Sequence, residues 1–283
     1  MQLSNLPTFQ LGLIGYPLGH SLSPKIHTTA LKACGLEGSY SLFPIPPEDT
    51  QALKDLLTRV RVGEIHGLNV TIPHKQNVIP LLDELTPTAK AIGAVNTIYL
   101  RENKLIGDNT DASGFLADIK RTFDFSSFTR SVHPSSLVLG AGGSARAVVY
   151  ALLNDGWRVT IAARRVEQAQ ELARQFAGIN IVELNFQTFQ PSNLQLIINT
   201  TPIGMSPNIE TSPLPENTVL SKSTFVYDLV YNPRETKLVK DARAQGLQAA
   251  TGLGMLIEQA ALAFELWTGL TPPRDILQNA TEH

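Results

Sequence analysis

The chain has 283 residues, of which 43% are hydrophobic and 17% are charged, and its formal net charge is −2. These values are typical of a globular protein with one large or two ordinary domains. The near-neutral charge gives no general attraction to nucleic acids or to anionic membranes, so we expect neither as a partner.

The first half of the chain alternates strand-like and helix-like segments, which predicts an α/β fold with mostly parallel sheets. Ser23 followed by Pro24 predicts a helix over residues 24–33 with Ser23 as its N-cap. The other expected elements are strands at 10–15, 40–45 and 65–70, helices at 47–60 and 73–82, and a hairpin of 94–100 and 104–106 around a turn at Glu102 and Asn103.

A glycine-rich segment, residues 137–145, reads L-V-L-G-A-G-G-S-A. It predicts a buried strand, a tight turn and a helix N-terminus, which is where a Rossmann unit binds a dinucleotide pyrophosphate. Gly140 allows the tight turn, Gly142 lets the backbone approach the phosphate, and Ala145 takes the third small position. The free N–H groups at the helix start would bind the anion.

The next strand-like segment, residues 158–163, ends at Ala163 and is followed by Arg164 and Arg165. An NAD-binding protein usually places Asp or Glu at this strand end, against the ribose 2′-hydroxyl. Two guanidinium groups and no carboxylate favour a 2′-phosphate instead, and so favour NADP as the cofactor. The remaining expected strands of this half are 179–184, 195–199, 224–229 and 247–250, which brings the total close to the six of a full Rossmann sheet.

Two helices are expected to connect the halves of the chain. Residues 111–121 predict a helix that links two domains, and 253–268 has the apolar spacing of a helix that packs back on the first domain. We therefore expect a discontinuous first domain of residues 1–110 plus about 253–283, and a second domain of residues 111–252.

Cysteine, histidine and N-terminal composition point to a cytoplasmic protein without a metal. Cys34 is the only cysteine, so no intrachain disulfide or cysteine-based metal site can form, and we expect Cys34 to be a small core residue. The six His residues are not spaced as metal ligands. No Lys or Arg precedes Lys25, so we expect neither a signal peptide nor a transit peptide. Glu258 and Glu265 interrupt the most apolar late stretch, so we expect no membrane span.

Short polar segments recur where a strand or turn meets the next element. They are residues 19–24 (GHSLSP), 69–75 (NVTIPHK), 93–97 (GAVNT), 107–111 (GDNTD) and 252–255 (GLGM). In open α/β folds such edges form the ligand crevice. Their hydroxyls, amides, carboxylates and one ammonium group suit a small polyhydroxylated substrate.

These segments, the glycine turn and residues 199–205 (NTTPIGM) follow the order of the signatures of the shikimate dehydrogenase family, which the chain resembles from about residue 10 to about residue 270. The resemblance implies a mostly parallel α/β substrate domain and a Rossmann-type NADP-binding domain. It also implies the NADPH-dependent, reversible reduction of 3-dehydroshikimate to shikimate, on the route to chorismate and the aromatic amino acids.

The resemblance also implies roles for residues of the first half. Ser21 and Ser23 would bind the substrate carboxylate, although Ser23 is also a plausible helix cap by its position before Pro24. The others near the substrate would be Thr71, Asn96, Asp111, Tyr231 and Gln259, for some of which turn, cap or solvated-face roles are the alternative.

Lys75 and Asp111 would be the catalytic pair by the same resemblance. Hydride delivery to a ketone leaves negative charge on oxygen and requires a proton. An ammonium group supplies both charge and proton, and a carboxylate holds it in place. A solvated Lys75 and a helix-capping Asp111 are the alternatives, and whether Lys75 transfers the proton or only stabilises charge stays open. His74 beside it is expected to be a bystander.

Cofactor binding would fall to residues of the second half. The pyrophosphate would lie on Gly140, Ala141, Gly142, Gly143 and Ser144, and the 2′-phosphate on Arg164 and Arg165. Thr200 would line the path from the adenosine to the nicotinamide, and Leu229 and Gly252 would lie against the nicotinamide. The family usually has Asn-Arg-Thr after the second strand and a further basic residue three positions on. This chain has Ala163-Arg164-Arg165 and Gln168 there, so one phosphate ligand has moved.

Three other functions remain as alternatives. A quinate/shikimate dehydrogenase that uses NAD should carry an acid where Arg164 and Arg165 stand, whereas acceptance of quinate depends only on local packing. A nucleotide sensor without catalysis should have lost Lys75 or Asp111. A module of a fused enzyme is disfavoured because no further catalytic domain fits in the chain. Both a monomer and a homodimer are consistent with the sequence.

Overall fold

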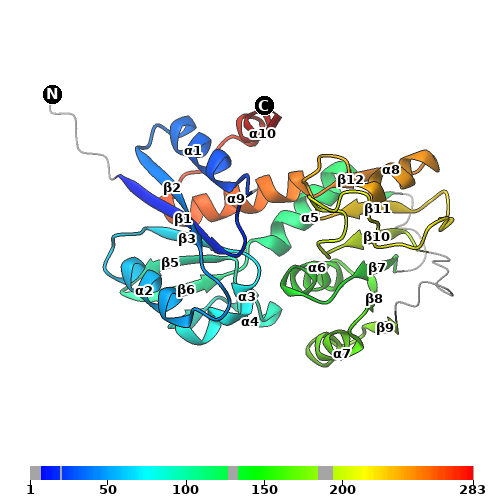
Figure 1. Ribbon diagram of the computed structural model, residues 1–283, viewed down its shortest axis with the longest axis horizontal. Helices are drawn as coiled ribbons and strands as arrows, with labels where there is room; N and C mark the ends of the chain where they lie inside the picture. Colours follow the sequence, from blue (N-terminus) through cyan, green and yellow to red (C-terminus); the bar gives the residue numbers. More distant parts are fainter. Residues whose placement is uncertain (1–7, 20, 127–132, 184–193, 283) are drawn as a thin grey trace. The chain divides into compact units, whose positions relative to one another are not determined.

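The structure is a computed structural model that describes residues 8–19, 21–126, 133–183 and 194–282. The chain forms two compact units, shown in Figure 1. The first consists of Met1–Thr110 and Ile257–His283, and the second of Asp111–Leu256. Each is described by itself.

The first unit contains a six-stranded sheet in the order β2-β1-β3-β5-β6-β4. Its strands are β1 (Phe9–Gly15), β2 (Gly38–Pro44), β3 (Gly67–Val70), β4 (Glu84–Leu85), β5 (Thr97–Arg101) and β6 (Lys104–Asp108). Only β5 runs against the other strands, so the mostly parallel sheet is confirmed. The expected hairpin is also confirmed: Glu102 and Asn103 join β5 to β6 with φ of 51° and 60°, the left-handed pair that a tight hairpin turn requires.

The helices of the first unit differ in how their first turns are capped. They are α1 (Ser23–Ala33), α2 (Thr50–Arg61), α3 (His74–Asn77), a 3-10 turn (Ile79–Leu81), α4 (Pro87–Ile92), α10 (Arg274–Glu282) and most of α9 (Leu253–Thr268). Asp49 caps α2 by accepting from the Ala52 amide at 3.0 Å, which is why this helix begins later than expected.

The expectation that Ser23 caps α1 was wrong. Ser23 is the first residue of the helix, and the cap position belongs to Leu22, which makes no side-chain cap bond. The physical reason is that the Ser21 hydroxyl accepts from the Ser23 amide at 3.2 Å. Cys34 was expected in the core, but it lies just after α1 and is partly exposed.

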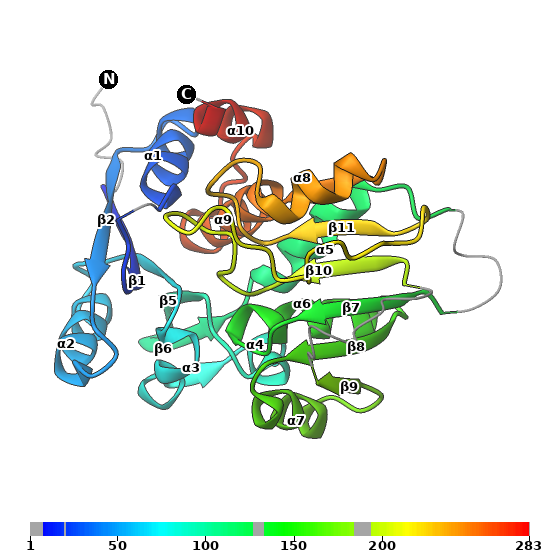
Figure 2. The same cartoon turned by 45° about the vertical axis from the view of Figure 1, so that its right-hand side comes forward.

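Both faces of the first sheet are covered by helices. On one face, α2 contributes Leu53, Leu56 and Leu57 to an apolar cluster with Leu68 and Ile98 of the strands. On the other face, Trp267 of α9 donates from its indole nitrogen to the Ile98 carbonyl at 3.1 Å, and α10 packs beside α1 (Figures 1 and 2).

α1 and α9 meet around a buried histidine. The His27 ring is fully buried and stacks on Tyr40 at 4.4 Å with an interplanar angle of 1°. Trp267 lies against it at 5.2 Å, tilted by 43°. This burial lowers the pKa of His27 to about 3, so the ring is neutral at physiological pH.

The second unit contains six parallel strands in the order β12-β11-β10-β7-β8-β9. They are β7 (Ser135–Leu139), β8 (Arg158–Ala163), β9 (Asn180–Glu183), β10 (Leu196–Asn199), β11 (Phe225–Asp228) and β12 (Ala249–Thr251). Numbered along this half, the order is 6-5-4-1-2-3, the order of a full Rossmann sheet. The fold class and all six expected strands are therefore confirmed.

Helices lie on both faces of this second sheet. The helices are α5 (Asp111–Thr122), α6 (Gly143–Asn154), α7 (Val166–Gln175) and α8 (Lys237–Ala244). Successive side chains of β11 point to opposite faces: Val226 packs with Leu238 of α8, whereas the Tyr227 ring meets Phe115 of α5 edge-on at 5.5 Å. In the parts of the chain that the structure describes, no helix is long and apolar enough to cross a membrane.

Candidate active site

Polar segments of the first unit gather at one edge of its sheet. Thr71 directly follows β3, and residues 109–110 directly follow β6. Because β5 is antiparallel, the start of β5, just after Asn96, lies at this same edge. In open α/β folds this carboxyl edge is where ligands bind.

Asn96 is the centre of a buried hydrogen-bond cluster at this edge. Its side-chain oxygen Oδ1 accepts from the Thr110 backbone amide at 2.8 Å, and its side-chain nitrogen Nδ2 donates to the Gln259 Oε1 at 3.2 Å. Asn96 and Gln259 are 2% and 8% exposed. The structure therefore brings together two predicted substrate residues that are 163 positions apart, and it adds Thr110, for which the sequence predicted no role.

A second polar layer supports this cluster. The Asn69 side chain, in β3, donates from Nδ2 to the Asn96 backbone carbonyl at 3.2 Å and accepts at Oδ1 from the Tyr40 hydroxyl at 2.8 Å. Asn69 belongs to the polar segment 69–75, but the sequence predicted no role for it. Its place in a strand, two residues before Thr71, is the signal that it would support the site from within the sheet.

Lys75 lies in the short helix α3 and is 8% exposed, so it is not a solvated surface lysine. Its backbone carbonyl accepts at 2.7 Å from the amide of Val95, the residue that precedes Asn96. The first turn of α3 is closed by the His74 amide, which donates to the Thr71 carbonyl at 2.9 Å. Backbone hydrogen bonds thus tie Thr71, Lys75 and the Asn96 cluster to one region of the first unit.

His74 holds α3 on the neighbouring loop. Its Nε2 lies 2.7 Å from the Ile45 carbonyl, which makes Nε2 the protonated nitrogen, and the ring is 1% exposed. This structural contact is consistent with the expected bystander role of His74.

Ser21 and Ser23 lie together at the start of α1. The 3.2 Å bond from the Ser23 amide to the Ser21 hydroxyl joins them, and Ser23 is 6% exposed. Ser23 does not cap the helix, so its hydroxyl has no role as an N-cap.

Two predicted substrate residues belong to the second unit. Asp111 is the first residue of α5 and is 5% exposed. Tyr231 follows β11 and is half-buried. Their nearness to the substrate stays a prediction.

The glycine turn of the second unit fits a dinucleotide pyrophosphate. Gly140 has φ of 108°, and a Cβ there would lie 2.7 Å from the Thr200 hydroxyl oxygen, so only glycine suits this position. Gly142 occupies the cap position of α6, which has no side-chain cap, and a Cβ on Gly142 would meet nothing within 4 Å. The α6 amides are therefore not covered by a capping side chain and can bind an anion.

Arg164 and Arg165 directly follow β8 and precede α7, and both are exposed. They lie at the same carboxyl edge of the sheet as the glycine turn, because β7 and β8 are parallel neighbours. Two exposed guanidinium groups beside a pyrophosphate cradle match the charge of an adenosine 2′-phosphate.

The nicotinamide-side residues also lie at this edge. Thr200 follows β10 and donates from its hydroxyl to the Leu139 carbonyl at 2.7 Å, which links it to the strand before Gly140. Leu229 and Gly252 are in direct contact: a Cβ on Gly252 would lie 2.5 Å from the Leu229 carbonyl oxygen. The structure thus brings the predicted cofactor residues together at the ends of five parallel strands.

A buried carboxylate that sequence analysis missed organises the loop after β10. Asp228 accepts from the Asn199 amide nitrogen at 2.8 Å, the Val230 amide at 3.0 Å and the Thr236 hydroxyl at 2.6 Å. Asn199 in turn accepts from the Thr201 amide at 2.9 Å. Burial raises the pKa of Asp228 to about 6, although these hydrogen bonds lower it.

The raised pKa of Asp228 gives a prediction about stability. A carboxyl whose folded pKa lies above its unfolded value binds protons more tightly when folded, so it favours the folded state more as the pH falls. We expect the free energy of unfolding of wild type, relative to Asp228→Asn, to rise by about 1 kcal/mol between pH 7.5 and pH 5. Urea unfolding of both proteins at the two pH values measures this. An unchanged difference would show that Asp228 titrates normally.

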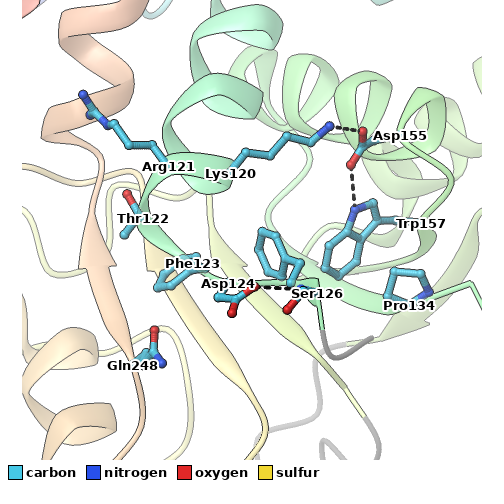
Figure 3. Close-up of a pocket in the computed structure, with 11 residues that line it drawn as sticks. Lys120, Arg121, Thr122, Phe123, Asp124, Ser126, Pro134, Asp155, Trp157 and Gln248 are labelled. Atoms are coloured by element: carbon cyan, nitrogen blue, oxygen red, sulfur yellow. Dashed lines mark hydrogen bonds and ion pairs between the residues drawn. The ribbon is translucent and has the colours of Figure 1, made fainter. Parts of the chain in front are cut away.

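A cavity of about 750 Å³ lies at the opposite edge of the second sheet. Pro134, Trp157 and Gln248, which line it, each precede a strand, whereas the glycine turn follows one. Figure 3 shows Asp155 between Lys120 and the Trp157 indole, so Lys120 and Asp155 are already paired. The cavity contains none of the predicted site residues. Among the described residues, no group of three His, Cys, Asp or Glu is placed to hold a metal ion.

Three family models together match most of the chain. The shikimate dehydrogenase substrate binding domain matches residues 13–98, shikimate / quinate 5-dehydrogenase matches residues 126–237, and the shikimate 5'-dehydrogenase C-terminal domain matches residues 252–281.

Individual relatives agree with the family models. An NADP(+) shikimate dehydrogenase of Carboxydothermus hydrogenoformans is 41% identical over 95% of both chains. The solved shikimate 5-dehydrogenase of Thermus thermophilus, in complex with NADP(H) and shikimate, is 38% identical with a TM-score of 0.84 and covers 97% of this chain and 99% of that one. The quinate dehydrogenase of Corynebacterium glutamicum, solved with NAD, is 33% identical with a TM-score of 0.84, at 97% and 99% coverage. The chain therefore belongs to the shikimate dehydrogenase family.

Proposed function

We propose that this chain catalyses the reversible, NADPH-dependent reduction of 3-dehydroshikimate to shikimate, in the biosynthesis of chorismate and the aromatic amino acids. The observation that carries the proposal is the buried Asn96–Gln259–Thr110 cluster at the carboxyl edge of the first sheet. A polyhydroxylated substrate needs such amide and hydroxyl groups. The Thermus thermophilus relative, solved with NADP(H) and shikimate, supports the same substrate and cofactor.

The substrate would be held by hydroxyl and amide side chains of the first unit. Ser21 and Ser23 would bind its carboxylate, and the absence of a capping role for Ser23 supports this. The other substrate-binding residues would be Thr71, Asn96, Asp111, Tyr231 and Gln259.

We assign the proton transfer to Lys75 and the orientation of Lys75 to Asp111. Bound NADPH supplies the hydride. The Lys75 ammonium would donate a proton to the ketone oxygen and stabilise the negative charge that develops on it, while the Asp111 carboxylate holds the ammonium and a substrate hydroxyl. The burial of both side chains supports these roles. Asn96 supports them too, because its side chain binds the amide of Thr110, the residue before Asp111. The residue before Asn96, Val95, donates its amide to the Lys75 carbonyl.

The second unit would bind the cofactor. Its pyrophosphate would lie on Gly140, Ala141, Gly142, Gly143 and Ser144, its 2′-phosphate on Arg164 and Arg165, and its nicotinamide side on Thr200, Leu229 and Gly252. Two features support this assignment: position 140 accepts only glycine, and the N-terminus of α6 has no side-chain cap.

We further propose that the substrate domain consists of residues 1–110 plus about 253–283 and that residues 111–252 form the cofactor domain. We also propose that the enzyme works in the cytoplasm, which the single cysteine of the sequence supports, as a monomer or a homodimer.

A four-way assay of nicotinamide reduction tests the proposed activity: shikimate or quinate, each with NADP or NAD. We expect substantial turnover only with shikimate and NADP. Comparable rates with quinate or NAD would instead place the chain in the broader quinate/shikimate class that the Corynebacterium relative represents. NADP binding without turnover in any combination would favour a nucleotide sensor.

Replacement of Arg164 tests the proposed phosphate site. Arg164→Ala removes one charge-assisted pair with the 2′-phosphate, so we expect the Kd for NADP to rise about 10- to 100-fold. The Kd for NAD, which lacks this phosphate, should change less than about twofold. Fluorescence titration of both cofactors measures these values.

Arg158→Ala is the matched control, because Arg158 is exposed at the opposite end of the same strand. It should leave both Kd values unchanged. Equal weakening of NADP and NAD by Arg164→Ala would contradict the assignment and indicate a pyrophosphate or folding role.

A further inference from the structure

Asp118, seven residues after the start of α5, is a buried carboxylate that the proposed reaction does not use. It is 3% exposed. Its two oxygens accept from the Tyr227 hydroxyl at 2.6 Å and from the Arg121 guanidinium at 2.6 Å. Hydrogen bonds to an ionised carboxylate are among the strongest in proteins, so Asp118 holds these groups firmly.

The Tyr227 hydroxyl joins three elements at this point. The ring is in β11, is fully buried and packs edge-on against Phe115 of α5. Burial and the neighbouring Asp118 carboxylate raise the pKa of Tyr227 well above its usual range, so the phenol stays protonated and donates to Asp118. Its oxygen also accepts from the Met255 amide, in the first turn of α9.

Gly254 lets α9 approach the carboxylate directly. A Cβ on Gly254 would lie 2.1 Å from Asp118 Oδ1 and 2.4 Å from Asp118 Cγ. Any larger residue would therefore push the first turn of α9 away from α5. The positive dipole end of this turn favours a negative charge, which compensates for burying Asp118.

The chain passes between the two units at two places, and both lie in the helices that Asp118 joins. It enters the second unit at Asp111, the first residue of α5, and leaves it after Leu256, within α9. Asp111 and Gln259 lie on these same two helices.

We propose that Asp118, together with Tyr227, is a positioning residue for the reaction: it holds α5 against the first turn of α9 and thereby sets the positions of Asp111 and Gln259. This inference rests on the proposed roles of those two residues. It makes the close approach at Gly254 a requirement of catalysis as well as of packing.

Tyr227→Phe tests the proposal by removing one hydroxyl while keeping the ring packed against Phe115. We expect kcat for shikimate oxidation to fall about tenfold and KM for shikimate to rise severalfold, because one charge-assisted hydrogen bond is lost. The Kd for NADP should stay within about twofold, since the glycine turn is made by other residues. Lys120→Ala is the matched control: Lys120 is exposed on the same helix and pairs with Asp155, so kcat should not change.

A pair of variants at the contact itself tests the geometry. Gly254→Ala should lower kcat because the methyl group displaces the first turn of α9, and Asp118→Ala should lower it through the lost hydrogen bonds. In the double variant the shortened side chain makes room for the methyl group, so the combined loss should be smaller than the product of the two single losses. A double variant that shows the full product would contradict the close approach.

Three outcomes separate the inference from the proposed function. If Tyr227→Phe and Gly254→Ala lower only Tm, with wild-type kcat and KM for shikimate, Asp118 has a purely structural role and the inference is overturned. If both change kcat while NADP binding is kept, it is supported. If the wild-type enzyme itself does not oxidise shikimate with NADP, the proposed function fails, and the positioning role for that reaction fails with it.

Discussion

Replacing Lys75 by alanine is expected to lower kcat for shikimate oxidation by about a thousandfold, since in the proposed mechanism Lys75 supplies both the proton and the positive charge at the reacting oxygen. Lys75 is 8% exposed and belongs to the first unit, whereas the glycine turn belongs to the second. The Kd for NADP should therefore remain within about twofold of the wild-type value. Steady-state kinetics and fluorescence titration measure the two quantities on the same preparation.

Lys90→Ala is the control for this experiment, because Lys90 is an exposed lysine in the last turn of α4 of the same unit. It should leave kcat and KM unchanged. Retention of more than about a tenth of the wild-type turnover by Lys75→Ala would contradict the assigned role, since general acid catalysis alone contributes about a hundredfold or more.

Lys75→Arg separates proton donation from charge stabilisation. An arginine keeps the positive charge but does not give up its proton in proteins. If Lys75 is the proton donor, we expect Lys75→Arg to be nearly as impaired as Lys75→Ala. Substantial recovery of kcat by arginine would mean that Lys75 mainly stabilises charge and that another group supplies the proton.

Local signals in the sequence were sufficient to predict the strands of the second unit. The glycine turn at Gly140 and the pair Arg164 and Arg165 each depend on a few neighbouring residues, and all six expected strands are present. Buried parallel strands read as short apolar runs, and their order follows from the known topology of the Rossmann sheet. The strands were predicted correctly because each depends on a short local pattern, and their order is that of a known fold.

Other features depend on contacts that no local pattern reveals. Gln259 meets Asn96 across 163 positions, and the sequence could suggest that contact only through a family resemblance. Ser23 followed by Pro24 is a common helix start, yet here the Ser21 hydroxyl accepts from the Ser23 amide. The helix therefore begins at Ser23, one residue earlier than expected. Asp228 carried no motif of its own, because its role depends on Asn199 and Thr236 from other segments.

The second large effect is expected at acidic pH and comes from His27. Burial lowers the pKa of His27 to about 3, whereas the unfolded chain binds this proton near pH 6.5. A group whose folded pKa is lowered in this way destabilises the folded state as the pH falls below its unfolded pKa. Between pH 7.5 and pH 5 the loss amounts to about 2 kcal/mol of the free energy of unfolding.

His27→Phe isolates this contribution, because phenylalanine keeps a ring against Tyr40 and Trp267 but has no proton to bind. We expect the variant to gain about 2 kcal/mol relative to wild type between pH 7.5 and pH 5, as measured by urea unfolding. Parallel pH curves for wild type and His27→Phe would show that His27 binds its proton equally well in both states.

The two buried groups act in opposite directions, which makes their assignment testable in one protein. Below pH 7 the protonation of Asp228 favours the folded state, and the proton that the unfolded chain adds at His27 favours unfolding. The Asp228→Asn variant should therefore be more acid-sensitive than wild type, and His27→Phe less so. A double variant should then show neither dependence, because the two residues lie in different units and should act additively.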